Sequence, residues 1–294
     1  NGFVFDSESS SNVNFTVEFD HVANGFVFVT IGGVTYNATV SGKEAKVIVP
    51  PLAVGKYDAI VSYNGVVNKT VAVNISPDRN PVLNISDIVM IYKDGTRMVA
   101  VLTDYLGNPI ANAIVYFTIN GQTYNKTTDV NGTASMGLNL ASNVYKATVS
   151  YKGSDKYNAV SKNITVTINP TIVADDLVKM YQNATRFYAK FTDSTGKAIA
   201  NKEIRFNING VFYTKKTDKD GVADLGIMLR PGSYILTAYN PVTGEEKGFN
   251  ITVKSLIMQN DLTKYYLNAS RFEATVYNKD GSLAVNKEVT FNIN

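Results

Sequence analysis

The chain is patterned by short runs in which hydrophobic and polar residues alternate. Between residues 12 and 75 the runs are VNFTVEF, GFVFVTI, VTYNATV, KVIVP, KYDAIVSY and TVAVNI, punctuated by Asn-Gly, Gly-Gly and Pro-Pro. A period of two in residues rich in Val, Thr, Tyr and Phe is typical of antiparallel strands joined by tight turns. No stretch shows the 3.6-residue period of an amphipathic helix. The pattern predicts an all-β protein.

The alternation also predicts which side chains face the core. Successive side chains on a strand point to opposite faces, so a face that stays apolar from copy to copy is the buried one. In one strand of three copies this face carries Met98, Ala100 and Leu102, then Phe187, Ala189 and Phe191, then Phe272, Ala274 and Val276. In the next strand it carries Val115, Phe117 and Ile119, then Ile204, Phe206 and Ile208, then Val289, Phe291 and Ile293.

The chain repeats at the length of a small domain. The stretch that begins at Gly107 begins again at Gly196 and at Gly281, intervals of 89 and 85 residues, which are too long for a solenoid repeat. We expect beads on a string: a variant domain at 1–76 that lacks its first strand, domains at 83–169 and 170–254, and a partial domain at 255–294 with its first strands only. Residues 1–11 are interpreted as a loop or a strand end.

The second domain shows the strand pattern most clearly. Strands are predicted at 87–92, 96–104, 113–119, 122–128, 133–140, 144–151 and 162–168. Seven strands at this spacing predict a two-sheet sandwich of the immunoglobulin-like kind. The proline-containing stretch from Ser76 to Val82, and Pro170, mark the domain boundaries.

Composition removes several classes of function. The 294 residues include no Cys, no Trp and a single histidine, His21, so disulfides are excluded and few groups remain for metal sites or acid–base catalysis. Lys plus Arg is 28 against 25 for Asp plus Glu, which gives no reason to expect nucleic acid as a partner. No apolar run approaches the length of a membrane span. The chain opens without Met or a signal-like segment, and we expect an internal piece of a longer product that is not an enzyme and holds no cofactor.

Two acidic turns are the candidate metal ligands. Asp129 and Asn131, and again Asp218 and Asp220, are each followed by Gly, as at the start of a calcium loop. The further oxygens and the Glu at the twelfth position of such a loop are missing from the sequence. The alternative, a hairpin turn in which Asp bonds its own backbone, is favoured because the first domain has Ser41-Gly42-Lys43 instead.

Other recurring residues have structural interpretations. Tyr57, Tyr145 and Tyr234 follow tight turns, where a tyrosine hydroxyl commonly bonds upstream backbone, a tyrosine corner. Asp and Arg recur ten residues apart, as ion pairs or as links that pin a linker to its neighbour, at Asp87 and Arg97, Asp176 and Arg186, and Asp261 and Arg271. Lys179 and Lys264 raise the possibility of a Lys–Asn isopeptide bond, although the second domain has Met90 at that position.

The chain is rich in Asn-X-Ser/Thr sequons, which suit an exported surface coated with glycans. The possible N-glycosylation sites are Asn14, Asn37, Asn68, Asn74, Asn84, Asn125, Asn131, Asn163, Asn183, Asn250 and Asn268.

The repeated motif resembles a known family. The pattern TDxxGxPxANxxVxFxINGxxYxxxTDxxGxAxLxxxLxxGxYxxTxxNPVTGE, read across 192–246 and echoed at 103–151, resembles the tandem Ig-like repeats of methanogen (archaeal) adhesin-like surface proteins. It is more distantly similar to the bacterial Ig-like domains of invasin and intimin. The resemblance implies a stalk, without catalytic residues, on the outside of a cell.

The predicted function is therefore structural. We expect an extracellular Ig-like stalk that presents or anchors an adhesion function, with flanking Ig-like domains and cell-surface or cell-wall molecules as partners. The alternative is a carbohydrate-binding, lectin-like module that uses exposed tyrosines such as Tyr188 and Tyr213 on cell-wall or host glycans. Head-to-tail self-association is a further possibility, because NGFVF at the start resembles NGVFY at 209–213 and would follow the terminal FNIN at 291–294 naturally.

Overall fold

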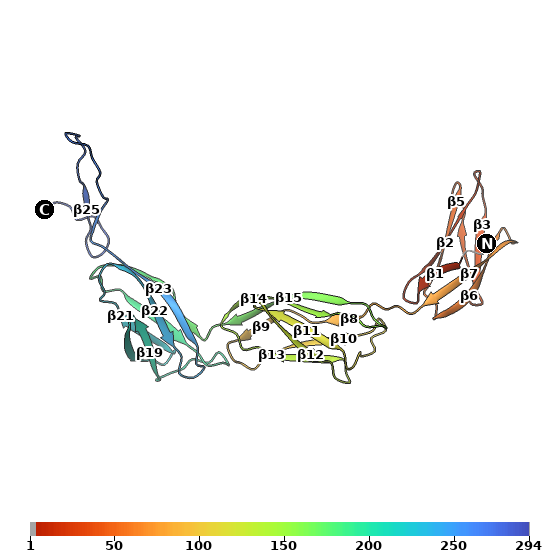
Figure 1. Cartoon of the computed structure of the whole chain (residues 1–294), viewed down its shortest axis with the longest axis horizontal. Helices are drawn as coiled ribbons and strands as arrows, with labels where there is room; N and C mark the ends of the chain where they lie inside the picture. Colours follow the sequence, from red (N-terminus) through yellow and green to blue (C-terminus); the bar gives the residue numbers. More distant parts are fainter. Residues whose placement is uncertain (1–3, 294) are drawn as a thin grey trace. The chain divides into compact units, whose positions relative to one another are not determined.

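The computed structural model describes residues 4–293, and the side chains of Val4, Val67 and Asn68 lie outside that description. Every element there is a strand, and no helix in this part is long and apolar enough to cross a membrane. By compactness the chain divides into two units, one of residues up to 85, 99–135 and 148–163, the other of residues 86–98, 136–147 and 164 onward. The strands form three β-sandwiches and a shorter hairpin, which confirms the predicted all-β, tandem Ig-like class (Figure 1).

The middle sandwich has two antiparallel layers with one parallel edge. The first layer has the order β12-β11-β14-β15-β9, the second β13-β10-β8, and β9 runs parallel to β15. The seven predicted strands are confirmed, with ends shifted by no more than three residues: β9 (Ile88–Ile91), β10 (Arg97–Thr103), β11 (Ile114–Ile119), β12 (Gln122–Thr127), β13 (Thr133–Gly137), β14 (Asn143–Tyr151) and β15 (Val160–Asn169). The sequence missed β8 (Val82–Asn84), because three residues are too few for alternation to show.

The third sandwich repeats this plan strand for strand. Its layers have the orders β17-β23-β22-β19-β20 and β16-β18-β21, and β17 runs parallel to β23. The strands are β16 (Ile172–Val173), β17 (Leu177–Met180), β18 (Arg186–Phe191), β19 (Glu203–Ile208), β20 (Val211–Lys216), β21 (Val222–Gly226), β22 (Gly232–Tyr239) and β23 (Glu246–Lys254).

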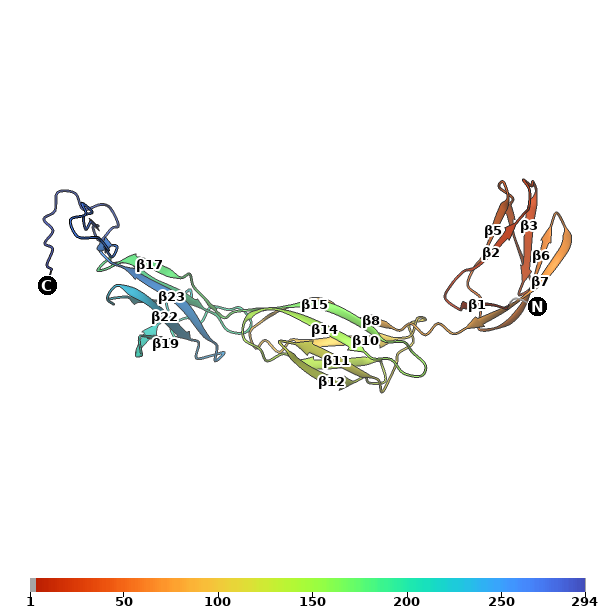
Figure 2. The same ribbon diagram turned by 45° about the horizontal axis from the view of Figure 1, so that its top comes forward.

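The first sandwich has the same large layer and a smaller second one. The orders are β1-β7-β6-β3-β4 and β2-β5, with β1 parallel to β7 (Figure 2). The strands are β1 (Val4–Glu8), β2 (Val13–Glu18), β3 (Phe26–Ile31), β4 (Val34–Thr39), β5 (Glu44–Val49), β6 (Gly55–Tyr63) and β7 (Val66–Ser76). Thus β1 is the counterpart of β9 and β17, and within residues 4–293 nothing in this sandwich corresponds to β8 and β16.

Residues 255–293 form a hairpin without a second layer. Its strands β24 (Ile257–Gln259) and β25 (Ala274–Val276) pair antiparallel, with Ile257 opposite Val276. The prediction that Phe272 and Phe291 are core residues is wrong here: they are 43% and 53% exposed. The reason is the single layer, since an apolar face is buried only against a second one.

The predicted cores of the second and third sandwiches are confirmed. The inward faces of β10 and β18 are at most 1% exposed and comprise Met98, Ala100, Leu102, Phe187, Ala189 and Phe191. In the third sandwich, Phe187 meets Phe206 edge-on with ring centroids 5.8 Å apart, the arrangement that aromatic quadrupoles favour.

Candidate functional site

The two acidic turns are closed by hydrogen bonds to their own backbone. Asp129 Oδ1 accepts the amide N–H groups of Asn131 and Thr133, both at 2.9 Å. Asp218 Oδ1 accepts those of Asp220 and Val222 at 2.9 and 2.8 Å. These are Asx turns, in which one carboxylate oxygen already has two donors.

Each turn ends on a glycine that the fold requires. Gly221 has φ +78°, and a Cβ there would lie 2.6 Å from the carbonyl oxygen of Phe191. Gly132 is equivalent, with φ +71° and a contact of 2.4 Å to the carbonyl of Leu102. Within the part of the chain that the structure describes, no group of three or more His, Asp and Glu side chains could hold a metal ion. The calcium hypothesis gains no support from these turns.

The tyrosine corners are confirmed in all three sandwiches. Each hydroxyl donates to the carbonyl oxygen four residues upstream at 2.9 Å, in the pairs Tyr57 and Ala53, Tyr145 and Ala141, and Tyr234 and Arg230. These side chains are therefore used by the fold and are half-buried, which leaves them unsuited to stacking on a ligand.

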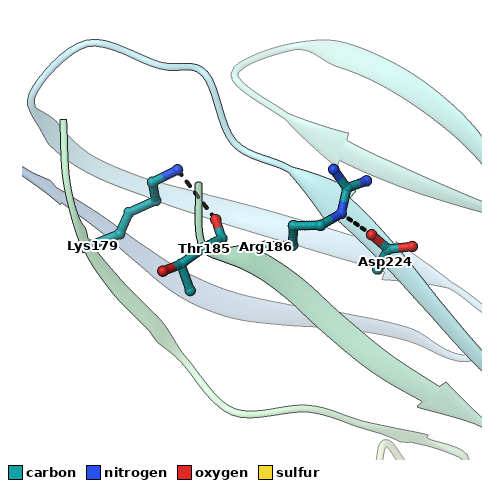
Figure 3. A network of polar contacts seen from close by, with 4 residues as sticks. All are labelled: Lys179, Thr185, Arg186 and Asp224. Atoms are coloured by element: carbon teal, nitrogen blue, oxygen red, sulfur yellow. Dashed lines mark hydrogen bonds and ion pairs between the residues drawn. The ribbon is translucent and has the colours of Figure 1, made fainter. Parts of the chain in front are cut away.

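Of the two interpretations of the recurring Asp and Arg, an ion pair or a link that pins a linker, the ion pair is wrong in the third sandwich. Asp176 instead accepts the backbone amide and the Nδ2 amide of Asn250 at 2.7 and 2.8 Å, which ties the start of β17 to β23. These two hydrogen bonds lower the pKa of the Asp176 carboxyl. Arg186 pairs with Asp224 of the neighbouring strand β21 (Figure 3). Asp87 resembles Asp176, because it accepts the amide of Thr165 at 2.7 Å.

Lys179 is a buried amine held by backbone carbonyls. It is 6% exposed, and its Nζ donates to the carbonyl oxygen of Ile227 at 2.8 Å. It also donates to the carbonyl oxygen of Thr185 at 3.2 Å (Figure 3). Burial lowers the pKa of its amine, because the charged form is poorly solvated there. Lys264 donates to the carbonyl of Ser270 at 3.0 Å in the same manner. Among the described residues neither amine has a hydrogen bond to an Asn side chain, so this arrangement does not prepare an isopeptide bond.

A buried polar cluster joins the linker residue Thr171 to the last hairpin of the third sandwich. The amide N–H and the hydroxyl of Thr171 donate to Glu245 Oε2 at 2.5 and 2.7 Å. Asn240 Nδ2 donates to the hydroxyl of Thr171 at 3.0 Å and to the carbonyl of Thr192 at 2.8 Å. Glu245 is 3% exposed, and a buried carboxylate of this kind is tolerated only because donors surround it.

Sequence reasoning missed this cluster. Asn240 and Glu245 belong to the motif NPVTGE, which was noted only as part of the resemblance. Thr171 is far from them in sequence, and its burial depends on the two-residue linker between β15 and β16. An isolated Glu in a Gly-containing turn carries no sign of burial.

The two tyrosines of the carbohydrate-binding hypothesis do not share a surface. Tyr188 lies in β18 of the small layer, and Tyr213 lies in β20 at the edge of the large layer; they are 58% and 36% exposed. On the outer face of the large layer, Arg205 instead lies against the rings of Phe212 and Tyr239, at 5.1 and 5.4 Å from their centroids. This is a cation–π arrangement that the sequence could not predict without the strand register.

A shallow cleft opens beside Arg205 and Tyr239. It has a volume of about 430 Å³, and Glu203, Arg205, Tyr239 and Glu246 are among the residues that line it. Charged groups beside an aromatic ring are able to bind polar ligands.

The predicted glycosylation sites lie mostly on the surface. Asn74 and Asn183 are half-buried, the side chain of Asn68 lies outside the described residues, and the others are exposed: Asn14, Asn37, Asn84, Asn125, Asn131, Asn163, Asn250 and Asn268. The Nδ2 atom, to which a glycan is attached, already donates a hydrogen bond at Asn74, Asn183 and Asn250. The exposed sites without such a bond are the better acceptors.

Comparisons with known proteins give structural neighbours only. No family model matches the chain, and no curated protein matches it. Among solved structures, the chain is similar to part of a 1.5-MDa bacterial ice-binding adhesin, with 19% identity, a TM-score of 0.30, and 86% of this chain and 93% of that one covered. It is also similar to titin domains I67–I69, in an E-to-A variant, with 11% identity, a TM-score of 0.28, and coverage of 86% and 95%.

Proposed function

We propose that the chain is a structural segment of an adhesin-like cell-surface protein, an Ig-like stalk that holds an adhesion function away from the cell. The observation that carries this proposal is that the residues that recur in each sandwich make contacts inside their own domain. The tyrosine hydroxyls and the aspartates of the Asx turns are engaged in intradomain hydrogen bonds, whereas the outward-facing residues of β10 and β18 differ from one sandwich to the next. What the repeat preserves is therefore the fold and not a binding surface.

The junction between the second and third sandwiches supports the same proposal. Only Pro170 and Thr171 separate β15 from β16, proline fixes its own φ, and Thr171 is fully buried. A short linker whose amide and hydroxyl are both engaged restricts bending at the junction, as a stalk requires.

The location, source and partners belong to this proposal as well. We propose an extracellular, glycosylated segment of archaeal type, related to the bacterial invasin fold and without enzymatic activity. The exposed sequons support the glycosylated surface, and the archaeal type and the invasin relation rest on the resemblance of the repeated motif. Its partners would be flanking Ig-like domains and cell-surface or cell-wall molecules. Head-to-tail association stays a hypothesis, and β1 gives it no support because it takes the place of β9 and β17.

Domain replacement in producing cells tests the stalk. Replacing residues 83–169 by an unrelated sandwich of the same length should preserve surface display and adhesion, because only length and stiffness matter to a spacer. Deleting these residues should weaken adhesion while surface display is retained. Loss of adhesion in the replaced protein, with display intact, would contradict the proposal.

The cleft at Arg205 and Tyr239 favours one alternative, a carbohydrate-binding module. A glycan array probed with the full chain tests it. Saturable, sugar-selective binding that is lost in Tyr239→Ala and kept in Tyr188→Ala would support a lectin function at this cleft. Binding lost in Tyr188→Ala would place it on the small layer instead, and no binding to any glycan would remove the alternative.

A further inference from the structure

The large layer of each sandwich ends in a strand that is paired on one side only. These strands are β4, β12 and β20, and among residues 4–293 their hydrogen-bonded neighbours are β3, β11 and β19. All six residues of β12 are exposed, and most of those of β4 and β20 are too. The same edge is open in all three repeats, so it belongs to the fold of the repeat. Such an edge is a template on which another chain can add a strand.

The hydrogen bond just after each strand shows which backbone groups face the open side. Val40 follows β4 and donates its N–H to the carbonyl oxygen of Gly25 at 2.9 Å, and Thr128 makes the equivalent bond after β12 at 2.8 Å. Neighbouring residues of an antiparallel strand direct their backbone groups to opposite sides. Asn37 and Asn125 each lie three positions earlier, so their own N–H and C=O groups face the open edge.

The three edge strands differ in the charges that oppose pairing. Lysines on an edge strand hinder the addition of a further strand, and β20 has two of them, Lys215 and Lys216. The strand β12 has only Lys126, and β4 has no charged residue. The two strands with the fewer charges are the ones that contain a sequon, at Asn37 and Asn125, and β20 contains none.

The two asparagines occupy the same place in the register. Asn37 lies opposite Phe28 of β3, and Asn125 lies opposite Tyr116 of β11. Both asparagines are exposed. Among the described residues, the Nδ2 amide of neither donates a hydrogen bond, whereas that of Asn74 does. A strand added to the edge would lie about 5 Å from either asparagine, inside the space that the first sugars of a glycan would fill.

We propose that N-linked glycans on Asn37 and Asn125 cover the open edges of the first and second large layers, where lysines protect that of the third. This inference rests on the glycosylated surface proposed above. It adds which sequons are used and what their glycans do, which is to keep the edge strands from pairing with another copy of the chain.

The modification transfers a sugar chain to an amide nitrogen. The donor is an oligosaccharide joined through its anomeric carbon to the phosphate of a lipid carrier. The bond between this carbon and the phosphate oxygen breaks, the carbon forms a bond to Nδ2, and the lipid phosphate leaves with the electron pair while Nδ2 gives up one proton to the medium. The acceptor pattern also requires Thr39 and Thr127, which are both exposed.

Glycopeptide mass spectrometry of the full chain from producing cells tests occupancy. We expect Asn37 and Asn125 to be modified in most molecules. If other sequons are modified and these two are not, this inference is overturned and the glycosylated surface stands. A chain without any glycan overturns both, while domain replacement still decides the stalk.

Variants at the two asparagines test what the glycans do. Asn37→Gln with Asn125→Gln removes both glycans, so at about 0.1 mM the chain should sediment as a dimer or larger, with slower amide exchange in β4 and β12. Asn37→Lys with Asn125→Lys also removes them but supplies the kind of charge found in β20, and should stay monomeric like the original chain. Asn131→Gln is the matched control: it removes a possible glycan from a turn, which has no open edge, and should stay monomeric.

Two sedimentation results would overturn the proposal. The first is a Gln double variant that stays as monomeric as the original chain, which shows that the edges need no cover. The second is equal association of the Gln double variant, the Lys double variant and Asn131→Gln, which shows that sugar acts on solubility in general and not at the edge. Unchanged amide exchange in β3 and β11 shows that the variants are folded.

Discussion

The first and third sandwiches share a large layer and differ in how the small layer is completed. In the third, β16 covers Phe191, and Thr171 just before it is fixed by Glu245. In the first, β2 takes the place of β18, since Phe19 donates its N–H to Lys43 as Phe191 does to Gly221. Among residues 4–293 β2 pairs with β5 alone, and Phe19 is half-buried. The comparison shows that the short strand after each linker does more than connect domains. It supplies the last part of the core, so that a domain boundary drawn from proline positions can cut through a structural element.

The largest expected effect on stability comes from removing one aromatic side chain, Phe191 at the end of β18 or its counterpart Phe19 just after β2. Phe191→Ala should lower the free energy of unfolding of the third sandwich by about 3–5 kcal/mol, because it leaves a cavity in a closed core. Phe19→Ala should lower that of the first sandwich by roughly half as much, because water already reaches this site. Native-state hydrogen exchange on the full chain reports each sandwich separately. Equal losses would show that the first core is as closed as the third.

The turn glycines should give the next largest difference. Gly221→Ala places a Cβ 2.6 Å from a backbone carbonyl at φ +78°, and we expect a loss of about 2–3 kcal/mol. Gly42→Ala has φ +64° but no atom within 4 Å of the new Cβ, so its loss should be about 1 kcal/mol. Thermal or denaturant unfolding of the full chain, resolved by exchange in each sandwich, measures both. If Gly42→Ala lowered stability as much as Gly221→Ala, the close contact of the new Cβ with the carbonyl of Phe191 would not be the cause of the larger loss.

Lys179 distinguishes the third sandwich from the second, where Met90 has the same place in the register. Lys179→Met should leave stability unchanged or raise it by up to about 1 kcal/mol, because an apolar side chain replaces a buried charge. Lys179→Ala is the matched control and should lose about 2 kcal/mol through the cavity.

The same lysine makes the stability of the third sandwich depend on pH. Its folded-state pKa is lowered, so between that value and the ordinary 10.5 the unfolded chain binds more protons than the folded one. The third sandwich should therefore gain stability as the pH rises through this interval, and below it the cost of burying the charge is present in full. Exchange-resolved denaturation across alkaline pH measures the gain, which should vanish in Lys179→Met. A gain that persists in this variant would assign it to another group.

The smallest effects on stability should be equal in the first and third sandwiches. Tyr57→Phe and Tyr234→Phe each remove one hydroxyl that donates to a carbonyl four residues upstream, and each should lower stability by about 1 kcal/mol. Because both corners have the same 2.9 Å bond, similar losses measured by exchange-resolved denaturation would show that the large layers are equivalent. A loss at only one of them would break that equivalence.

Alternation and repetition were sufficient to predict much of the fold. They identified seven strands of the second sandwich and the inward faces of β10 and β18, because a buried face repeats every second residue. They failed for features that no repeat along the sequence marks. The strand β8 is three residues long, and Ile172 and Val173 make β16 shorter still. The prediction that Phe272 is buried was wrong, because alternation tells which face of a strand is apolar and not whether a second layer covers that face.

The candidate site residues divide in the same way, into local contacts that the sequence predicts and contacts between distant strands that it does not. The tyrosine corners were predicted because a tyrosine after a tight turn forms a local contact. The Asp224 partner of Arg186 and the Glu245 partner of Thr171 depend on register between distant strands, and no spacing in the sequence encodes them.

The most direct test of the central claim is amide hydrogen exchange at two equivalent residues of the full chain. The claim is that the short strand after each linker closes a sandwich, and that in the first one β2 pairs, among residues 4–293, with β5 alone. The amide of Lys190 faces β16 and should be strongly protected, whereas that of Glu18 should exchange nearly as fast as in an unfolded peptide, with its neighbours Val17 and Phe19 protected. Equal protection of Glu18 and Lys190 in the monomeric chain would contradict the claim.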